Sequence, residues 1–475
     1  MDNSWIHEAG TKRKMPTGVM KTKVVITALI ILSCGILTVS LSGLGSNATQ
    51  YQAEGLVIEF EHYNTVWTDA SFREYETVSE LTDYACSNQG YTFTKDASGK
   101  ITSIDGKTDS SESTWSLWVA DNDASSLSKS SDYNLRCEGH KVIVWAYCPE
   151  GSEPTLALDA TGTSIYGYAQ AQRTVTLSPV CTEIVSAMNA LSTIVGTDSF
   201  SDYPDTIVTE KKNGHIATVG TYVSPSYEAI MHTSPDMVFC DGSQYDHRAM
   251  AEILRNSNVN AVVLKNGTDI ETIYDNIFIV GTAMGYNLRA IQIIDDLHAA
   301  MAIIESKVSG STALKVMCSL SSDAAPWIAG NNTYISDIIS TVNMVNTYQF
   351  IDGWTPITPE MIGIYDDSTY DSDIIFVMTD TEAYSATEAS YNELIHYLPE
   401  NWKKTTAYQN GDIYLFCESF GEMAQRSATR FAQLTEIIAR ITSPDAFTDG
   451  VTVPKYIGDD YRDYLKITDH LGFEG

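Results

Sequence analysis

The stretch "RTVTLSPVCTEIVSAMNAL", residues 173–191, decides the fold of the larger part of this chain. Valine and leucine alternate with polar residues over 173–178, which predicts a strand. The residues that follow, 182–191, have the apolar spacing of a helix. A strand followed at once by a helix is the unit from which helix-covered parallel sheets are built, so this stretch predicts an α/β fold.

The same alternation continues to the end of the chain. Short apolar runs at 236–241 and 260–265 have the character of buried parallel strands. Further strands are predicted at 314–320, 373–379 and 411–416, and a closing helix at 426–441. Between the two sets of strands, residues 269–310 follow a helical pattern without proline, in two pieces, 269–285 and the longer 288–308, divided at Tyr286 and Asn287. We therefore predict two Rossmann-like lobes joined by one long helix: lobe 1 over 155–268, the interlobe helical segment over 269–310, lobe 2 over 311–445 and a C-terminal tail over 446–475.

Residues 50–149 form a separate β-rich domain in this prediction. Strands are expected at 56–63, 113–121 and 140–147, with a short amphipathic helix at 78–86. Polar runs rich in Ser, Asp and Gly separate them. One disulfide, between Cys86 and either Cys137 or Cys148, is compatible with this domain, but spacing alone does not choose the pair.

The N-terminus predicts export. Residues Val24–Gly45 hold no charged side chain, enough for a helix that crosses a bilayer, and basic residues precede them. We expect a cytoplasmic segment over 1–23, a transmembrane anchor over 24–45 and the rest of the chain outside the cell membrane. A cleaved signal peptide with "SNA" (46–48) as its site, or lipidation at Cys34, are the alternatives, and both also export the remainder.

Bulk charge and missing motifs exclude several functions. The formal net charge of −32 disfavours nucleic acid, whose binding depends on Lys and Arg. Nucleophile-elbow, zinc-protease, P-loop and dinucleotide-binding motifs are absent, and the nine histidines lack metal-ligand spacing. We therefore expect neither an enzyme nor a bound cofactor.

One device occurs twice, as "GTYVSPSYE" (220–228) and "DGWTPITPE" (352–360). In each copy an aromatic residue, Tyr222 or Trp354, stands six positions before a glutamate, Glu228 or Glu360. Ser226 and Thr358 are good N-caps, which places each glutamate in the first turn of a helix.

The aromatic residues precede the caps, on loops that follow strands. Ligands of open α/β sheets bind beyond the carboxyl ends of the strands, and between two lobes that place is the interlobe cleft. We predict that Tyr222 and Trp354 face each other across the cleft, while Glu228 and Glu360 point outward toward a paired partner.

The order of several motifs resembles a known family, the substrate-binding proteins of type II ABC importers, which take up cobalamin, ferric siderophores and haem. The similarity covers residues 155–445. Its motifs are "LDATGTSIYGYAQAQRTVTLSPVCTEIVSAM", "SDYP" (201–204), "VGTYVSPSYEAIMHTSPDMVF" (219–239), "PWIAGNNTYISDII" (326–339) and "GWTPITPEMI" (353–362).

The cobalamin-binding branch is the most similar, because it shares "SDYP" and the aromatic-to-glutamate spacing. This resemblance implies a two-lobed, class III periplasmic-binding-protein fold and a corrinoid in the cleft. The resemblance implies that the ligand is contacted by Tyr203, Tyr222, Trp327 and Trp354, and a looser match adds Phe420. The resemblance also implies that Glu228 and Glu360 dock onto the permease dimer, which works with its ATPase subunits. The tyrosine at 222 departs from the branch, which has tryptophan there.

Residues 55–147 independently resemble the small β-rich, β-grasp-like domain at the C-terminus of transcobalamin and intrinsic factor. The shared stretches are "ITSIDGKTDSSESTWSLWVADND" and "CEGHKVIVWAY". Two modules with cobalamin-associated relatives favour cobalamin as the transported ligand of a monomeric receptor.

Other ligands stay open. Anionic ferric siderophores call for arginine in the cleft, for which Arg248, Arg426 and Arg430 are the candidates. Haem calls for an axial ligand, for which Tyr203, Tyr222 or Met423 qualify. A surface adhesion or scaffold protein without a transported ligand is the alternative from another class.

Overall fold

The computed structural model describes residues 55–61, 64–69, 75–121, 128–151, 154, 159–163, 165, 171–363, 368–379 and 384–471. The chain divides into Met1–Tyr51 and the compact unit Gln52–Gly475. The predicted segments 1–23 and 24–45 lie outside the described residues. Within the described part of the chain, no helix is long and apolar enough to cross a membrane.

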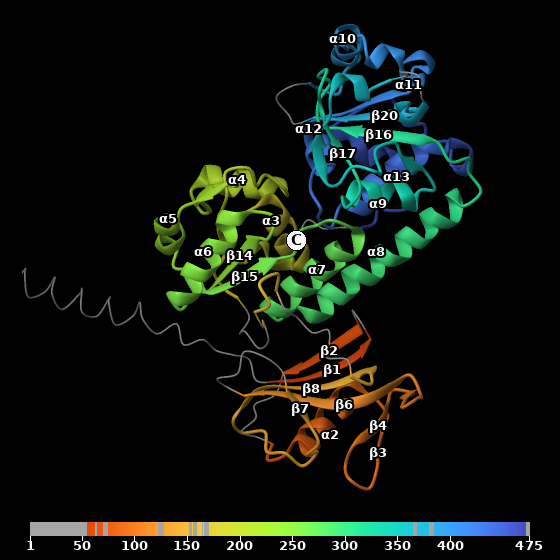
Figure 1. Cartoon of the computed structure of the whole chain (residues 1–475). Helices are drawn as coiled ribbons and strands as arrows, with labels where there is room; N and C mark the ends of the chain where they lie inside the picture. Colours follow the sequence, from red (N-terminus) through yellow and green to blue (C-terminus); the bar gives the residue numbers. More distant parts are fainter. Residues whose placement is uncertain are drawn as a thin grey trace, which may run out of the picture. The chain divides into compact units, whose positions relative to one another are not determined.

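The N-terminal domain is a mixed five-stranded sheet with one helix against it (Figure 1). In the order β2-β1-β8-β6-β7, β1 and β8 run parallel and the other neighbours antiparallel. The elements are β1 (Gly55–Glu61), β2 (Asn64–Asp69), α2 (Val78–Gln89), β6 (Ser113–Asp121), β7 (Ser128–Ser130) and β8 (His140–Pro149), with a second sheet of β3 (Phe93–Lys95), β4 (Ile101–Ile104) and β5 (Lys107–Thr108). The predicted strands and the helix are all present.

Alternate residues of this sheet build the core beneath α2. Leu56, Trp115 and Trp145 belong to one buried apolar cluster with Val78 of the helix. Thr77 and Glu80 form a capping box that starts the helix, as the sequence pattern S/T-x-x-E favours. The predicted disulfide does not form, because Cys86 is a buried free thiol.

Lobe 1 contains a five-stranded parallel sheet in the order β11-β10-β9-β14-β15. Its elements are β9 (Thr174–Thr176), α3 (Pro179–Val185), β10 (Ile194–Thr197), α4 (Asp205–Asn213), β11 (Ala217–Thr218), α5 (Tyr227–His232), β14 (Met237–Asp241), α6 (Tyr245–Asn256) and β15 (Asn260–Leu264). The helix predicted over 182–191 is shorter: a turn at 186–190 contains Asn189 in the left-handed region at φ 61°, which ends the regular helix.

Two consecutive helices lead from lobe 1 to lobe 2. These are α7 (Ile270–Met284) and α8 (Asn287–Val308), separated by Gly285 at φ 74°. A left-handed residue ends an α-helix, and glycine adopts that conformation without a side-chain clash. The break predicted at Tyr286 and Asn287 and the long helix predicted after it are confirmed, and the chain turns back on itself at Gly285 before α8 crosses to lobe 2 (Figure 1).

Lobe 2 is built on a second sheet, β19-β17-β16-β20-β21-β22, with β18 also on β16. Its elements are β16 (Lys315–Ser319), β17 (Trp327–Ala329), α9 (Tyr334–Thr341), β18 (Val345–Asn346), β19 (Trp354–Pro356), β20 (Ile374–Met378), α10 (Glu388–Tyr397), α11 (Thr406–Asn410), β21 (Ile413–Phe416), α12 (Glu418–Met423), α13 (Phe431–Thr442) and β22 (Tyr456–Ile457).

The end of the chain is part of lobe 2. Strand β22 lies parallel to β21, and the buried carboxylate of Glu436 in α13 accepts backbone hydrogen bonds from Ile467 and Thr468. Residues 446–471 of the segment predicted as a tail therefore complete this lobe. The closing helix also begins at Phe431, five residues after the predicted start, because residues 426–430 form the loop described below.

Candidate ligand-binding site

The repeated glutamates are both on the surface, but their local structures differ. In lobe 1, the Ser226 hydroxyl accepts a hydrogen bond from Ala229 N at 3.3 Å, and Glu228 is exposed in the first turn of α5, as predicted. In lobe 2, Pro359–Met361 is a single 3-10 turn without a side-chain cap. Hydrogen bonds from its own backbone N–H and from Thr358 hold the pKa of Glu360 below its usual range. Thr358 at the N-cap position and Glu360 in the first turn are as predicted, but the helix expected to follow is only this single 3-10 turn.

Tyr222 and Trp354, from the two copies of the device, line one cavity of about 390 Å³. Lobe 1 contributes loops that follow the carboxyl ends of β14 and β15, where parallel sheets place their ligands. The other lining residues are mostly neutral and polar: Val180, Asp241, Ser243, Gln244, Leu264, Lys265, Asn266, Gly267 and Thr268 from lobe 1, with Asn332, Thr333, Tyr334, Gly353, Gln425 and Ser427 from lobe 2.

The phenol of Tyr222 is held in place by two neighbours. Its oxygen accepts from Gln244 Nε2 at 2.6 Å and shares a hydrogen bond with Ser243 Oγ at 3.2 Å. Burial raises the pKa of Tyr222, so the phenol stays protonated at neutral pH. The ring is thus a fixed, neutral wall of the cavity.

Trp354 belongs to a short antiparallel ribbon with Trp327. In the register of β17 and β19, Ala329 is opposite Trp354 and Trp327 is opposite Pro356. Residues two apart on a strand, and residues directly opposite on its partner, share a face. Trp327 and Trp354 therefore lie on the same face of this ribbon. Trp327 is 50% exposed and does not line the cavity.

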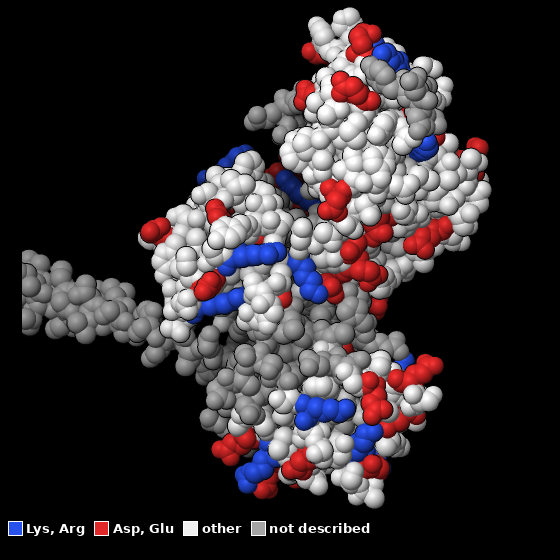
Figure 2. Space-filling model, in the orientation of Figure 1, with Lys and Arg blue, Asp and Glu red and all other residues white. Residues whose placement is uncertain are grey.

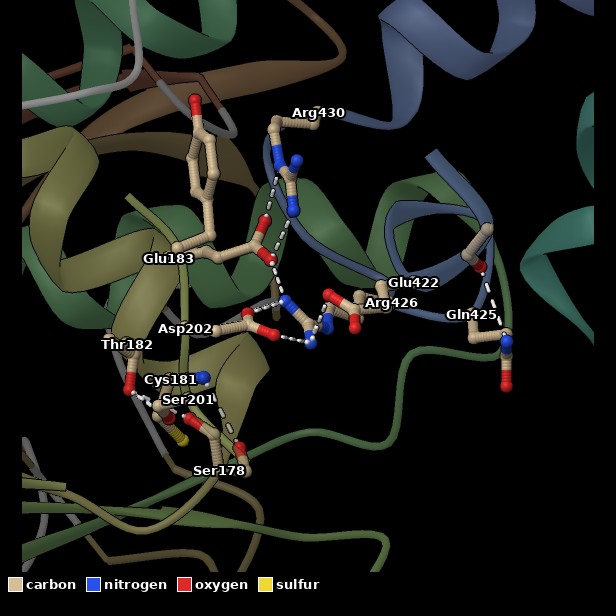
Figure 3. Close-up of polar contacts among 12 residues, drawn as sticks. Ser178, Cys181, Thr182, Glu183, Ser201, Asp202, Glu422, Gln425, Arg426 and Arg430 are labelled. Atoms are coloured by element: carbon tan, nitrogen blue, oxygen red, sulfur yellow. Dashed lines mark hydrogen bonds and ion pairs between the residues drawn. The ribbon is translucent and has the colours of Figure 1, made fainter. Parts of the chain in front are cut away.

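A buried ion cluster connects the lobes beside this cavity (Figure 3). Glu183 of α3 accepts from Arg430 Nε at 2.9 Å, Arg430 Nη2 at 2.6 Å and Arg426 Nη1 at 3.2 Å. Arg426 also donates to Asp202 at 2.6 Å. Burial opposes ionisation of Asp202, but hydrogen bonding to Arg426 and its charge outweigh burial and lower the pKa of that carboxyl.

Tyr203 lines a second cavity, of about 520 Å³. The guanidinium of Arg430 lies 3.6 Å from its ring centroid, and Arg462 Nη2 donates to its hydroxyl at 3.1 Å. Gln425 and Ser427 line the first cavity whereas Arg430 lines the second, so the loop 425–430 separates them. The expectation that Tyr203, Tyr222 and Trp354 line one site is wrong for Tyr203 in this conformation.

A model of the family described as periplasmic binding protein matches residues 175–418, more than half of the chain. The chain belongs to this family. The lipoprotein YvrC of Bacillus subtilis (strain 168), an uncharacterized ABC transporter substrate-binding lipoprotein, is 21% identical over 300 residues, 62% of this chain and 88% of the relative. A periplasmic heme-binding protein from Pseudomonas aeruginosa is 18% identical over 58% of this chain and 94% of its own, with a TM-score of 0.47. The vitamin B12-binding protein BtuF of Vibrio cholerae is 17% identical over 58% and 98%, with a TM-score of 0.46.

The binding protein buries one residue that was expected in the cleft. Phe420 is completely buried, with its ring 4.8 Å from that of Phe416 and 5.4 Å from that of Tyr461. Met423, a candidate haem ligand, is also buried, at 1% exposure. Both lie on α12, whose apolar side faces the core of lobe 2, so the expected cleft position of Phe420 was wrong.

Several residues of the site were not found from the sequence of the binding protein. Glu183 is the glutamate of the "TEI" helix, and a polar residue among buried helix positions was the available signal for a partner. Gln244, Asn266 and Asn332 gave no signal, because a neutral amide in a loop has no distinguishing spacing. Among the described residues, no group of three or more His, Cys, Asp or Glu side chains is arranged to hold a metal ion.

Proposed function

We propose that this binding protein is the extracytoplasmic substrate-binding subunit of an ABC importer and that its ligand is a corrinoid. The observation that carries the proposal is the pairing of Tyr222 with Trp354 in one cavity between the lobes. Each comes from the same sequence device in its own lobe. Aromatic faces supplied from two sides suit a flat ligand, which they hold by apolar contact.

The chemistry of the lining supports a ligand rich in neutral amides, which a corrin carries around its ring. Gln244, Asn266, Asn332 and Gln425 offer amide donors and acceptors to such groups. The lysine of the cavity, Lys265, is 2.8 Å from Asp275, so its charge is already paired. This lining favours a neutral ligand over an anionic one.

Size places a condition on this proposal. A corrinoid is larger than a cavity of about 390 Å³, so the ligand must extend beyond it. Trp327 supplies apolar surface for that extension, because it continues the face on which Trp354 lies and is half exposed. A corrinoid that also reached Tyr203 would have to displace the loop 425–430 and its ion cluster.

The second candidate is haem or a ferric siderophore, and the other interlobe cavity favours it. Arg430 and Arg462 are close to the Tyr203 ring there, and arginines bind carboxylate groups well. Asp205 and Asp459 line the same cavity and would repel an anion, which weakens this candidate.

Delivery to a membrane permease would use the two exposed glutamates. Glu228 and Glu360 stand on different lobes, so a permease with two related subunits would meet one on each. On the face that Figure 2 shows, acidic side chains are spread over the described residues between groups of Lys and Arg, and the formal net charge of −32 would steer the protein toward basic partner surfaces. Reversing the charge of both glutamates to lysine should abolish transport and leave ligand affinity unchanged. Loss of affinity would contradict this division of roles.

We also propose that residues 50–149 are a transcobalamin-like β-grasp domain, held at the membrane by the N-terminal segment. Support comes from the strand order, in which the first and last strands are parallel neighbours and β2, among the described strands, pairs with β1 alone. Such topology is compatible with a β-grasp sheet.

Calorimetry on the full chain in detergent tests the ligand. Cyanocobalamin, haemin and a ferric siderophore would be titrated into the wild type and into Tyr222→Ala, Trp354→Ala and Arg462→Ala. The matched control is Tyr397→Ala, because Tyr397 on α10 is 72% exposed. A corrinoid ligand predicts that Tyr222→Ala and Trp354→Ala each lose about tenfold or more in affinity.

Other outcomes decide between the candidates. If the heat of binding of haemin or of the siderophore is smaller in Arg462→Ala than in the wild type but is unchanged in Tyr222→Ala, the second candidate is supported. The absence of heat with all three compounds would contradict an importer for these ligands and favour the scaffold alternative.

A further inference from the structure

His247, in the first turn of α6, is fully buried. Its two ring nitrogens contact the backbone of two different segments, one at the end of β14 and one in the loop that carries Tyr222. Its Nδ1 accepts the backbone N–H of Asp241 at 2.9 Å, at the end of β14. Its Nε2 is 2.7 Å from the backbone carbonyl oxygen of Tyr222. One imidazole therefore ties the loop that carries Tyr222 to the carboxyl end of a central strand.

The two hydrogen bonds fix the protonation state of the ring. A backbone N–H can only donate, so Nδ1 must be unprotonated. A carbonyl can only accept, so Nε2 must carry the proton. The imidazole that satisfies both partners is the neutral Nε2–H tautomer, and a doubly protonated ring would lose the bond to Asp241.

The same end of α6 also holds the Tyr222 side chain. Gln244, the residue at the N-cap of α6, donates to the Tyr222 hydroxyl, and the His247 ring packs edge-on against the Tyr222 ring at 5.9 Å. Tyr222 is therefore fixed at its carbonyl, its ring and its hydroxyl by one helix terminus.

We propose that His247 is the positioning residue that aims Tyr222 into the interlobe cavity, and that protonation of His247 releases Tyr222 and weakens ligand binding. The effect on ligand rests on the proposed function, because it requires Tyr222 to contact the ligand. The effect on the loop does not.

The charges around His247 set the direction of the pH effect. Burial lowers the pKa of His247 below its usual range, against the opposing influence of Asp241 at the end of β14, Asp198 after β10 and Asp246 on α6 itself. A base with a lowered pKa stays neutral as pH falls to its ordinary value of 6.5 and gains its proton only below that. Tyr222 should thus be held firmly above pH 6.5 and released at lower pH.

Hydrogen exchange in the ligand-free full chain tests the positioning. We expect amides of the loop 219–227 to exchange about five- to tenfold faster, after correction for intrinsic rates, in His247→Ala than in the wild type, the loss expected for one or two neutral hydrogen bonds. His247→Gln should restore protection, because its amide nitrogen reaches about as far as Nε2 and can donate to the Tyr222 carbonyl. The control is His232→Gln, because His232 is exposed on α5 of the same lobe.

A pH series of ligand affinity then tests the switch, with whichever compound binds in the panel above. Wild-type affinity should be constant from pH 8 to 6.5 and should fall below pH 6.5. His247→Gln, which cannot titrate, should bind at neutral pH and lose that fall. Any decline left in His247→Gln belongs to the carboxyl of Asp198, whose pKa is raised by burial.

The outcomes separate the two proposals. Unchanged loop exchange in His247→Ala would overturn the positioning role, whatever binds. Faster loop exchange without any ligand in the panel would leave the positioning role standing and contradict the proposed function. An identical pH profile in the wild type and in His247→Gln would overturn the protonation step.

Discussion

Replacement of Arg430 by methionine should destabilise the protein strongly, because it breaks a fully buried ion pair. Arg430 is 2% exposed, and Glu183, which receives two of its hydrogen bonds, is 1% exposed. Methionine keeps much of the volume but leaves the Glu183 carboxylate with one contact, from Arg426 at 3.2 Å. Removing one partner of a buried pair costs about 3–5 kcal/mol, because the other charge stays desolvated.

Thermal unfolding followed by tryptophan fluorescence measures this cost. The pair joins both lobes, about 300 residues, for which 1 kcal/mol corresponds to about 1.5 °C at an unfolding entropy of about 2.1 cal/mol/K per residue, so Arg430→Met should lower Tm by about 5 °C or more. Lys403→Met is the matched control, because its pair with Glu400 is on the surface and should have no measurable effect. The double variant Glu183→Met with Arg430→Met should regain part of the loss, since no uncompensated charge remains at that pair.

A drop of less than about 2 °C in Arg430→Met would refute this reasoning, because a buried carboxylate that keeps only its longest hydrogen bond, from Arg426, must cost more than that. Such a result would mean that water reaches Glu183 and that the lobes are open in solution. The loop 425–430 would then not divide the cleft, and Tyr203 would share a space with Tyr222.

Three further predictions concern other parts of the lobes. Phe420→Ala should cost about 3–5 kcal/mol of stability by leaving a cavity in the core, with ligand affinity unchanged at temperatures where the protein is folded; a loss of affinity alone would place Phe420 in the site. Gly267→Ala should weaken ligand binding, because the added methyl group would collide with the Ser427 side chain across the cavity; unchanged calorimetry would show that the loop yields. Hydrogen bonds from Arg440 lower the pKa of Asp449 from 3.8 to about 2, so this carboxylate stabilises the fold above pH 3.8 and the contribution is lost as pH falls toward 2; Asp449→Asn should flatten the acid limb of a Tm-against-pH curve, and an unchanged limb would contradict it.

The sequence by itself determined the order and type of the main elements. The runs 236–241 and 373–379 are mostly apolar because both faces of an interior parallel strand are covered, and they became the interior strands β14 and β20, whereas the similar run 260–265 became the edge strand β15. The spacing of aromatic and glutamate in the two repeated stretches also predicted that Tyr222 and Trp354 would meet, because loops at the carboxyl ends of strands face the same cleft.

Only the tertiary structure decided which polar residues pair across the lobes. Glu183 and Arg430 are 247 residues apart in sequence, and no local pattern relates them. With this pairing, residues 426–430 form a loop and not the first turn of the predicted helix, and that loop separates Tyr203 from Tyr222. The role of His247 was equally hidden, since a lone histidine acquires a partner on each nitrogen only when a strand end and a loop are brought to its two sides. Long-range hydrogen bonds depend on which loops meet, and that is set by packing rather than by spacing along the chain.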